Sequence, residues 1–348
     1  MKKNLVVTGS SGLVGSEIVE LLSNDFNQVF GIDNNLRKYF FGEQGNVKNR
    51  EKSLKKKIHN YTHFDLDIRE KNKIFNIVKK IKPFAIIHCA GQPSHDLAAK
   101  IPFDDFETNA NGTLNLLEAI RRYSKKTIFI FLSTNKVYGD NPNKLGLNEL
   151  KMRYEYNNKK FKKGINEKLS IDQNTHSIFG ASKLSADILV QEYGNNFGIK
   201  TVCFRGGCLT GSSHRGAELH GFLSYLVKTA LNKKVYKVFG FKGKQVRDNL
   251  HSSDLVNAFW EFYKKPKIGK VYNIGGSRKS NCSILEAVYL IEDFAKIKVN
   301  LKLINKARVG DHIWWITNNS KFKKDYPNWK QNYDIKKIIK ELIKNNDG

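Results

Sequence analysis

Residues 5–33 follow the order strand, glycine-rich turn, helix, strand and acid, and few folds accommodate that order. The apolar run 5–7 leads into a turn and a helical pattern of apolar residues, and the next apolar run ends at Asp33. The turn reads Thr8-Gly9-Ser10-Ser11-Gly12-Leu13-Val14-Gly15. Gly9 permits a tight turn, Gly12 allows the backbone to approach a pyrophosphate, and Gly15 allows close packing of the helix on the strand. We therefore predict a dinucleotide-binding unit.

Asp33 narrows the choice of dinucleotide. A carboxylate at that position would accept hydrogen bonds from an adenosine ribose and would repel a 2′-phosphate. The sequence predicts NAD as the cofactor. Arg37, four residues further on, keeps NADP as the less favoured alternative.

The chain is strongly basic, with a net charge of +27 over 348 residues. The excess comes from 49 lysines and 11 arginines spread along the whole length, and the lysine clusters lack the interleaved aromatic residues of a nucleic-acid stacking surface. We interpret them as solvated surface, not as a nucleic-acid patch. The charge would help to attract an anionic small substrate.

The four cysteines form no CxxC pair and lack the spacing of metal ligands. This favours free thiols in a reducing compartment and no metal site. No stretch reaches the length of a signal-peptide core or a membrane helix. The sequence predicts a cytoplasmic protein that does not bind membranes.

Strand-like runs recur at 5–7, 28–32, 85–88, 127–132 and 201–204, with helical patterns between them. This alternation predicts an α/β fold, a doubly wound Rossmann-type parallel sheet with a smaller C-terminal substrate-binding lobe. We expect residues 1–204, with 250–275 returning to them, to form the NAD-binding domain, and 205–249 and 276–348 to form the lobe.

Two connections are unusually long. Residues 37–62 and 140–176 each exceed an ordinary loop, and such segments are typically functional lids or disordered excursions. We expect the second to face the substrate, because it leads into the candidate active-site helix.

Ligands of a doubly wound sheet bind at the carboxyl ends of the strands, so residues there are candidates. Asp67 would either meet the adenine amino group or cap a helix that begins at Arg69. A turn of small residues follows the strand 85–88 and suits close passage of a cofactor. The predicted cofactor-binding residues are Gly9, Ser11, Gly12, Leu13, Val14, Gly15, Asp33, Asn34, Arg37, Asp67, Ile68, Ala90, Gly91, Gln92, Asn109, Ser133 and Lys183.

The turn 8–15, the helix 109–119, Ser133-Thr134 and Gly180-Ala181-Ser182-Lys183 together resemble the extended short-chain dehydrogenase/reductase family, which contains nucleotide-sugar epimerases, dehydratases and decarboxylases. The similarity continues through 247–251, 272–276 and 308–311. Within the family, 133–140 and 243–248 are most similar to epimerases of CDP-linked sugars. The resemblance implies a nucleotide-diphosphate sugar as substrate, with CDP-linked sugars favoured, and a role in surface polysaccharide biosynthesis.

The resemblance also implies a homodimer formed through helices near 110–124 and 182–197. Apolar positions on these helices are compatible with that interface and equally with a monomer's core. They include Leu114, Leu117, Leu184, Ile188 and Leu189.

The two residues that follow Thr134 help to decide between dehydration and epimerisation. The dehydratases of the family carry an Asp-Glu pair there, because elimination of water needs an acid and a base, whereas this chain has Asn135-Lys136. Epimerisation by transient oxidation and re-reduction is therefore favoured. The alternatives are another nucleotide-sugar-modifying activity, as a reductase, decarboxylase or dehydratase, and a catalytically silent NAD- or nucleotide-sugar-binding protein.

The family's catalytic pair is a tyrosine and a lysine four residues apart on one helix, and here the tyrosine position is Phe179 while Lys183 is in place. Phenylalanine cannot exchange a proton. The chain is then an engineered variant that traps substrate, a natural variant that uses another base, or a binding protein without chemistry. The candidate replacement bases are Lys183, Thr134, Lys136, Tyr138 and His176, the last being equally well a solvent-facing residue at the helix start.

The resemblance places Thr134 on the reacting oxygen and Arg247 and Arg308 on the diphosphate, for which a planar guanidinium is suited. For Arg247, ion pairing with Asp248 or Asp254 is the structural alternative. Trp314 and Trp315 would stack on a base or, as we favour, fill the core of the lobe. The predicted substrate-binding residues are Gln92, Thr134, Asn135, Gly206, Gly207, Arg247, Arg308 and Asp311.

Overall fold

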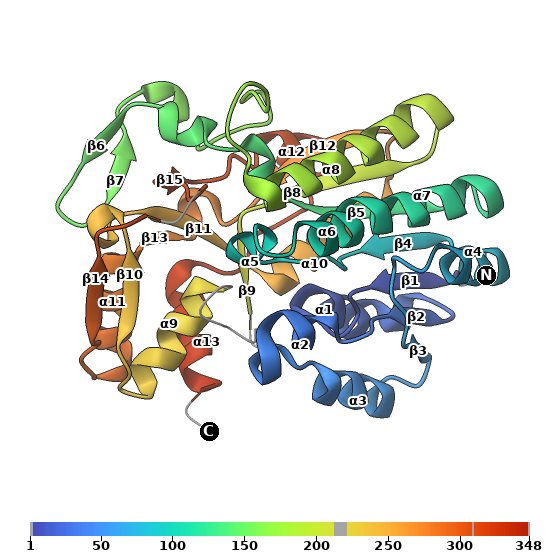
Figure 1. Ribbon diagram of the computed structural model, residues 1–348, viewed down its shortest axis with the longest axis horizontal. Helices are drawn as coiled ribbons and strands as arrows, with labels where there is room; N and C mark the ends of the chain where they lie inside the picture. The colour runs from blue at the N-terminus through green and yellow to red at the C-terminus, as the bar shows by residue number, and fades with distance from the viewer. Residues whose placement is uncertain (1–2, 212–220, 308–309, 347–348) are drawn as a thin grey trace. The chain divides into compact units, whose positions relative to one another are not determined.

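The computed structural model describes residues 3–211, 221–307 and 310–346 (Figure 1). The chain forms two compact units. Unit 1 comprises Met1–Val137, Ile178–Arg205 and Leu255–Tyr272, and unit 2 comprises Tyr138–Ser177, Gly206–Asp254 and Asn273–Gly348. Residues 138–177 thus group with the second unit.

A seven-stranded sheet runs in the order β12-β8-β5-β4-β1-β2-β3. The strands are β1 (Leu5–Thr8), β2 (Val29–Ile32), β3 (Tyr61–Phe64), β4 (Ala85–His88), β5 (Ile128–Thr134), β8 (Thr201–Gly206) and β12 (Lys270–Ile274). β1 pairs in parallel with β2 on one side and with β4 on the other. The strand order reverses between β1 and β4, which is where a doubly wound sheet binds its ligand. The predicted α/β fold with a parallel sheet is confirmed.

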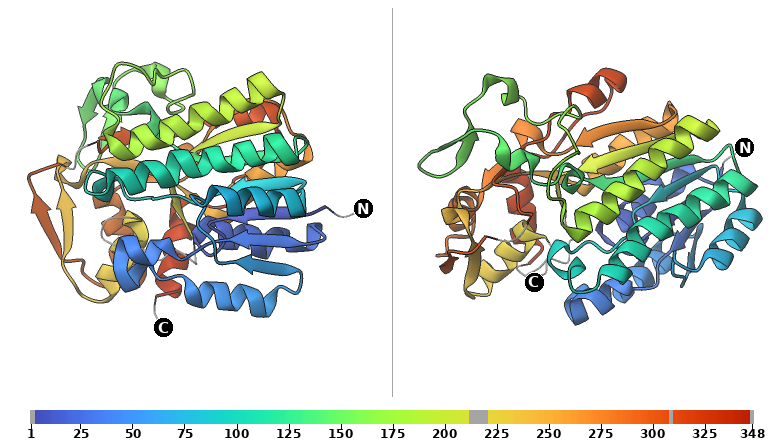
Figure 2. Two further views of the ribbon diagram at one scale, coloured as in Figure 1. Left: turned by 45° about the vertical axis from the view of Figure 1, so that its right-hand side comes forward. Right: turned by 45° about the horizontal axis from the view of Figure 1, so that its top comes forward.

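Helices cover both faces of this sheet. α4, α7 and α8 share a buried core with the strands that includes Ile120, Phe129 and Val190 (Figure 2). On the other face, Phe26 packs edge-on against Trp260 of α10. The helices of unit 1 are α1 (Leu13–Leu22), α2 (Leu36–Phe41), α3 (Lys48–Lys57), α4 (Lys71–Ile81), α5 (His95–Ala98), α6 (Pro102–Phe106), α7 (Gly112–Tyr123), α8 (Ser177–Phe197) and α10 (Ser252–Lys264). The first residues of α8 and α10 precede the segments Ile178–Arg205 and Leu255–Tyr272 of the unit.

The long connection 37–62 is largely helical, since α2 and α3 occupy much of it. Leu54 is fully buried and thereby ties α3 to the unit's core. Asn35 Oδ1 accepts a hydrogen bond from Val47 N at 2.9 Å, which joins the start of α2 to the start of α3. The segment is an ordered helical excursion that follows Asp33.

Unit 2 is built around β11 (Val246–His251), which pairs with β9 (Cys208–Thr210), β13 (Asn281–Ser283) and β15 (Trp314–Trp315). β10 (Tyr236–Phe239) pairs with β14 (Leu301–Ile304), and β6 (Leu147–Glu149) with β7 (Tyr154–Tyr156). The helices are α9 (Phe222–Leu231), α11 (Ile284–Ala295), α12 (Ser320–Asp325) and α13 (Ile335–Lys344). Leu226, Val288 and Ile339 belong to the core that α9, α11 and α13 share. The antiparallel pair β6 and β7 forms a short hairpin within the connection 140–176.

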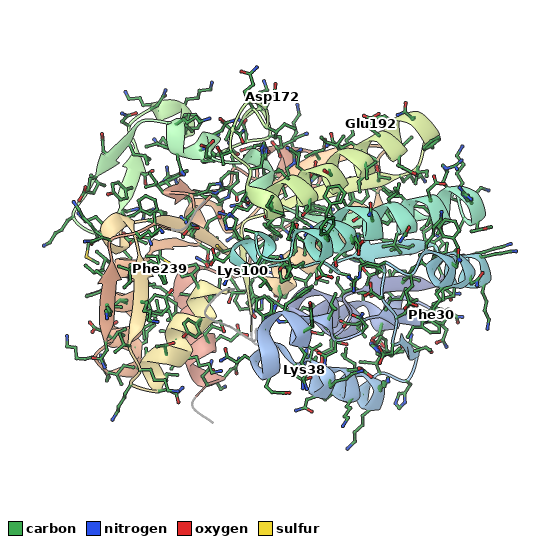
Figure 3. All side chains as sticks on the ribbon, in the orientation of Figure 1. Phe30, Lys38, Lys100, Asp172, Glu192 and Phe239 are labelled. Atoms are coloured by element: carbon green, nitrogen blue, oxygen red, sulfur yellow. The ribbon has the colours of Figure 1, made fainter. Side chains whose placement is uncertain are left out.

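The surface carries many of the charged residues. Figure 3 labels Lys38, Lys100, Asp172 and Glu192, all of which are exposed. Within the described part of the chain, no helix has both the length and the apolar character needed to cross a membrane.

Candidate active site

The glycine-rich turn between β1 and α1 leaves space and donors for a phosphate. Gly9 has a φ of +67°, and a Cβ on Gly15 would lie 2.0 Å from Gly9 O. Gly12 is the N-cap of α1, and no side chain caps that helix. The buried Ser11 hydroxyl has no hydrogen-bond partner. A tight backbone cradle with an unpartnered hydroxyl, at the positive end of a helix, fits the pyrophosphate of NAD. Leu13 and Val14 form the first turn of that helix.

Asp33 closes the same turn from the end of β2. Its Oδ2 accepts a hydrogen bond from Ser11 N at 3.0 Å, and its Oδ1 accepts one from Asn35 N at 2.8 Å. Burial raises the pKa of Asp33. An ionised carboxylate has about four acceptor positions, so lone pairs are left for ribose hydroxyls after these two bonds.

Asp67 is held in a turn beside Asn34. Asn34 Nδ2 donates to Asp67 Oδ2 at 3.1 Å, and Arg69 N donates to Asp67 Oδ1 at 2.9 Å. Burial raises the pKa of Asp67, but the hydrogen bonds from Arg69 outweigh it and lower that pKa overall. The interpretation of Asp67 as a helix cap is wrong, because α4 begins at Lys71 with Glu70 as its N-cap. The contact with adenine stays a prediction.

Three further predicted cofactor residues have structural contacts. The Arg37 guanidinium lies 4.8 Å from the centroid of the Phe41 ring, and burial lowers the pKa of Arg37 to about 10. Ile68 is buried against α7, where a Cβ on Gly112 would come within 2.6 Å of its Cδ1. Ala90 N donates to Thr8 Oγ1 at 3.2 Å.

A buried polar network joins the loop after β4 to α8. Asn109 lies in a π-helical turn, Glu107–Asn111, a geometry common at functional sites. Its Oδ1 accepts from Gln92 N at 3.0 Å, and its Nδ2 donates to Ser182 Oγ at 3.1 Å. Gln92 Nε2 and Ser182 Oγ both donate to the Asp105 carboxylate. Gln92 and Asn109 therefore fix the loop by which a cofactor would pass.

Lys183 is positioned at the carboxyl end of β5. Its Nζ donates to Leu132 O at 3.0 Å and lies 4.2 Å from the centroid of the Phe131 ring. A Cβ on Gly91 would be 4.0 Å from the same Nζ. Burial lowers the pKa of Lys183 to about 8. The ammonium thus lies beside the glycine-containing turn that the sequence predicted to suit close passage of the cofactor.

The lowered pKa of Lys183 predicts a pH dependence of stability. The folded pKa of about 8 lies below the ordinary value of 10.5, so the unfolded chain binds the extra proton between these values and stability rises with pH there. The burial cost is fully present below about pH 8 and is relieved as pH approaches about 10.5, by on the order of 3 kcal/mol. Denaturant titrations of the cofactor-free protein near pH 7 and pH 10 should show this rise, and Lys183→Met should lack it. Equal pH dependence of the two proteins would contradict the assignment.

Ser133, another predicted cofactor residue, anchors a second buried network. Its Oγ donates to Asp187 Oδ2, and Arg205 Nε and an Nη donate to the two oxygens of the same carboxylate at 3.1 and 2.8 Å. Asp187 is fully buried, and the Arg205 side chain is 5% exposed. This network ties β5, α8 and β8 together one turn beyond Lys183.

Phe179 lies one helical turn before Lys183 on α8 and is buried. Its ring meets the His95 ring edge-on, with centroids 6.4 Å apart. Thr134 ends β5, and its Oγ1 accepts a hydrogen bond from Lys136 N at 3.2 Å. Asn135, the next residue, is buried at the start of the 3-10 turn Asn135–Tyr138.

Two of the candidate replacement bases lie in unit 2. Tyr138 is fully buried, and its hydroxyl donates to Asn273 Oδ1 at 2.7 Å, so its proton serves a structural bond. His176 precedes α8 and is partly exposed. Sequence reasoning did not single out His95, although its position just after the loop that follows β4 was a usable signal.

Of the predicted substrate-binding residues in unit 2, Arg247 and Asp311 come together. Arg247 Nη2 donates to Asp311 Oδ1 at 3.2 Å, so its acidic partner is neither Asp248 nor Asp254, which the structural alternative had named. Gly207 N donates to Ile274 O at 3.1 Å. Gly206 ends β8, and Arg308 lies outside the described residues.

Trp314 and Trp315 are fully buried on β15, as the core interpretation predicted. Trp314 packs against the Tyr156 ring with centroids 4.2 Å apart. Trp315 Nε1 donates to Thr317 Oγ1 at 3.0 Å. Both indoles fill the core of unit 2.

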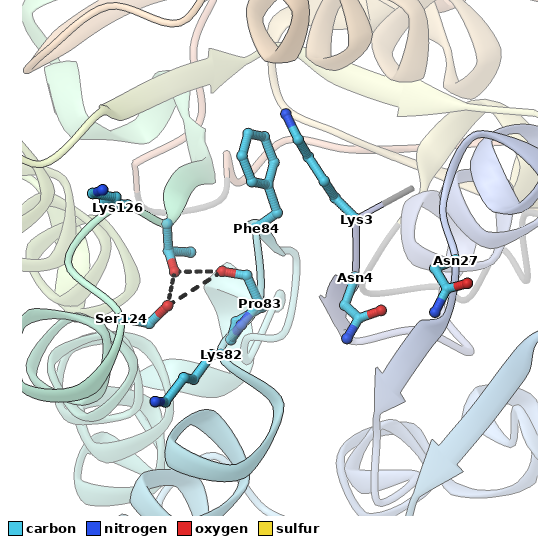
Figure 4. Close-up of a pocket in the computed structure, with 9 residues that line it drawn as sticks. Lys3, Asn4, Asn27, Lys82, Pro83, Phe84, Ser124 and Lys126 are labelled. Carbon is cyan, nitrogen blue, oxygen red and sulfur yellow. Dashed lines mark hydrogen bonds between the residues drawn. The ribbon is translucent and has the colours of Figure 1, made fainter. Parts of the chain in front are cut away.

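A cavity of about 370 Å³ in unit 1 lies away from these residues (Figure 4). Lys3 and Asn4 before β1, Phe84 before β4 and Thr127 before β5 line it, so it lies at the amino ends of the strands. Ligands of doubly wound sheets bind at the opposite edge. The cavity therefore belongs to neither predicted binding site.

Comparison with known proteins gives the family. Residues 5–275 match the model of the NAD dependent epimerase/dehydratase family. The chain is 33% identical over 299 residues to CDP-paratose 2-epimerase of Salmonella typhi, covering 84% of this chain and 85% of that protein. It is 28% identical over 360 residues to dTDP-glucose 4,6-dehydratase of Haemophilus influenzae, covering 97% and 92%.

Solved structures agree on the fold. A tyrosine-to-phenylalanine mutant of UDP-glucuronic acid 4-epimerase from Bacillus cereus, in complex with a fluorinated UDP-sugar and NAD, has a TM-score of 0.81 at 22% identity and covers 99% of both chains. UDP-glucose 4-epimerase of Thermus thermophilus in complex with NAD has a TM-score of 0.76 at 22% identity, again covering 99% of both. The chain belongs to the NAD dependent epimerase/dehydratase family, and the resemblance inferred from its sequence is confirmed.

Proposed function

We propose that this chain is an NAD-dependent epimerase of a nucleotide-diphosphate sugar, with CDP-linked sugars as its substrates. The observation that carries the proposal is the placement of Lys183, whose Nζ is held by Leu132 O where β5 ends in Ser133 and Thr134. The identity to CDP-paratose 2-epimerase supports the CDP-linked substrate. Asn135 and Lys136 stand where the resembling dehydratases carry an acidic pair, which supports epimerisation over dehydration.

In this proposal the residues of unit 1 bind and orient. The turn at Gly12 would hold the pyrophosphate, and Asp33 would bind the adenosine ribose and disfavour NADP. Lys183 would hold the nicotinamide ribose, and Thr134 would donate a hydrogen bond to the reacting oxygen. Bound NAD supplies reversible hydride transfer. We further propose that Arg247 and Arg308 contact the diphosphate, that the chain acts as a cytoplasmic homodimer, and that its product enters polysaccharide synthesis.

The proposal predicts turnover without net redox change. Incubated with CDP-paratose and a panel of other sugar nucleotides, the chain should convert a CDP-linked sugar to its epimer, detected by proton NMR, while NADH absorbance stays constant. Lys183→Met should abolish product formation. Phe179→Tyr is the second variant, because it restores the family's phenol.

Three other outcomes of this assay would indicate a different function or a disabled enzyme. Steady accumulation or loss of NADH would identify a net redox enzyme. Bound NAD with no product from any sugar nucleotide, for the chain and for Phe179→Tyr alike, would favour the binding protein. Turnover by Phe179→Tyr alone would mean that Phe179 disables an otherwise standard epimerase.

A further inference from the structure

We propose that His95 is the proton acceptor of the reaction, in place of the hydroxyl that Phe179 lacks. This inference rests on the proposed function. It starts from the absence of a proton acceptor at residue 179 of α8. Lys183 is in place, but the phenyl ring one turn earlier cannot take the proton that leaves a sugar hydroxyl during oxidation.

The imidazole of His95 lies against that ring. The two centroids are 6.4 Å apart in an edge-on arrangement, and both residues belong to unit 1. The side chain of His95 can exchange a proton, and its ring directly contacts the ring of Phe179. An imidazole is the most common general base in enzymes.

The surroundings of the two ring nitrogens of His95 suit this role. Its Nε2 is buried and has no hydrogen-bond partner. Its Nδ1 lies 3.6 Å from Asp96 Oδ1, so the carboxylate would stabilise the imidazolium after proton transfer. A buried nitrogen without a partner costs free energy unless a ligand satisfies it.

The loop that precedes His95 is held by hydrogen bonds and also reaches Lys183. Ser94 caps α5 by accepting from Leu97 N, and Ser94 N in turn donates to Gln92 Oε1. Gln92 is bonded to Asp105 in the buried network. Gly91, at the start of the loop, is the residue whose Cβ would lie 4.0 Å from Lys183 Nζ. The short segment from Gly91 to His95 thus positions the proposed base and also lies beside Lys183.

Three of the other candidates, Tyr138, Lys183 and Thr134, have competing roles. The Tyr138 hydroxyl donates a hydrogen bond to Asn273 Oδ1. Lys183 Nζ donates to Leu132 O and is needed for the ribose. Thr134 Oγ1 accepts from Lys136 N and would itself be a donor to the reacting oxygen.

The proposed step balances. The hydroxyl proton of the sugar passes to His95 Nε2 while the hydride on the same carbon passes to NAD⁺, which leaves a ketone and an imidazolium. In the return step the hydride adds to the other face of the ketone, and the imidazolium gives its proton back to the oxygen. No further oxidant or reductant is consumed.

The test compares His95→Gln with the double variant Phe179→Tyr/His95→Gln. His95→Gln should lower kcat about 100-fold, the lower end of the usual effect of a general base. It should keep NAD affinity, measured by fluorescence titration, because the ring does not contribute to the cofactor cradle. The double variant should regain most of the activity, since a phenol at residue 179 would replace the imidazole. His59→Gln, at an exposed histidine outside the site, is the matched control and should be unaffected.

A spectroscopic readout accompanies the kinetics. In ¹⁵N-labelled protein, the ring signals of His95 should shift when a CDP-linked sugar is added, and those of His59 should not. Activity of His95→Gln equal to the unmodified chain would overturn the assignment and leave the proposed function intact. Inactivity of both variants with NAD bound would also overturn it, because the imidazole would then be needed for something that a phenol cannot supply. Absence of turnover by the unmodified chain, with turnover by Phe179→Tyr, would overturn this assignment alone. Absence of turnover by both would overturn the proposed function as well.

Discussion

Replacement of Arg205 by methionine is expected to lower the free energy of unfolding by about 3–5 kcal/mol, because it leaves a buried carboxylate without its cation. Arg205 donates two hydrogen bonds to Asp187, and the Asp187 side chain has no exposed surface. Ser133 Oγ and Gln191 Nε2 remain as donors to that carboxylate but carry no charge. Denaturant titration of the variant measures the loss.

Two comparisons isolate the cause. Lys73→Met removes a cation from an exposed pair with Glu70 and should cost less than about 1 kcal/mol. Arg205→Met/Asp187→Leu removes both charges and should recover much of the loss, because an apolar pair of similar volume replaces a buried ion pair at little cost. A loss below about 1 kcal/mol for Arg205→Met would contradict the buried pair.

Replacement of Gly15 by alanine is expected to weaken NAD binding about 100-fold, equivalent to about 3 kcal/mol. The new Cβ would lie 2.0 Å from Gly9 O and 2.8 Å from Ser10 Cα, which are backbone atoms that cannot move without the turn. Displacement of the turn would move the amides and the Ser11 hydroxyl away from the pyrophosphate. Isothermal titration with NAD measures the affinity, and a denaturant midpoint measures the accompanying overpacking cost of about 3 kcal/mol.

Gly12→Ala separates packing from phosphate approach. Its Cβ would have a single close neighbour, Gly9 O at 3.3 Å, and its φ of −74° suits alanine. The variant should keep its stability within about 1 kcal/mol. It should bind NAD more weakly if the pyrophosphate passes over Gly12. Unchanged NAD affinity in Gly15→Ala would show that the turn is not the cofactor site.

The local features of the fold could be predicted because each depends on residues close in sequence. The apolar run 5–7 and the turn after it predicted β1 and α1, and Asp33 does close that turn through Ser11. The alternation of runs predicted the parallel sheet. The connection 37–62 shows the limit, since α3 is strongly polar and is held by Leu54 and by contacts that periodicity does not reveal.

The partners in the candidate site could not be predicted because they are distant in sequence. The Asp187 carboxylate meets Ser133, 54 residues earlier, and Arg205, 18 residues later. Asn109 bonds Ser182 across 73 residues. Only the folded sheet sets such pairings. The same holds for His95, whose contact with Phe179 depends on how α5 lies against α8.

The two buried networks fix α8 along its own axis. Ser182 is bonded to Asp105 and Asn109, and Asp187 is bonded to Ser133 and Arg205, on either side of Lys183. Shifting the helix by one residue would break every one of these directional bonds at once, so intermediate registers have no stabilising partners. Partial loosening of the unit by heat or denaturant would therefore reduce the number of molecules with a correctly placed lysine, while the rate of each remaining competent molecule would stay the same.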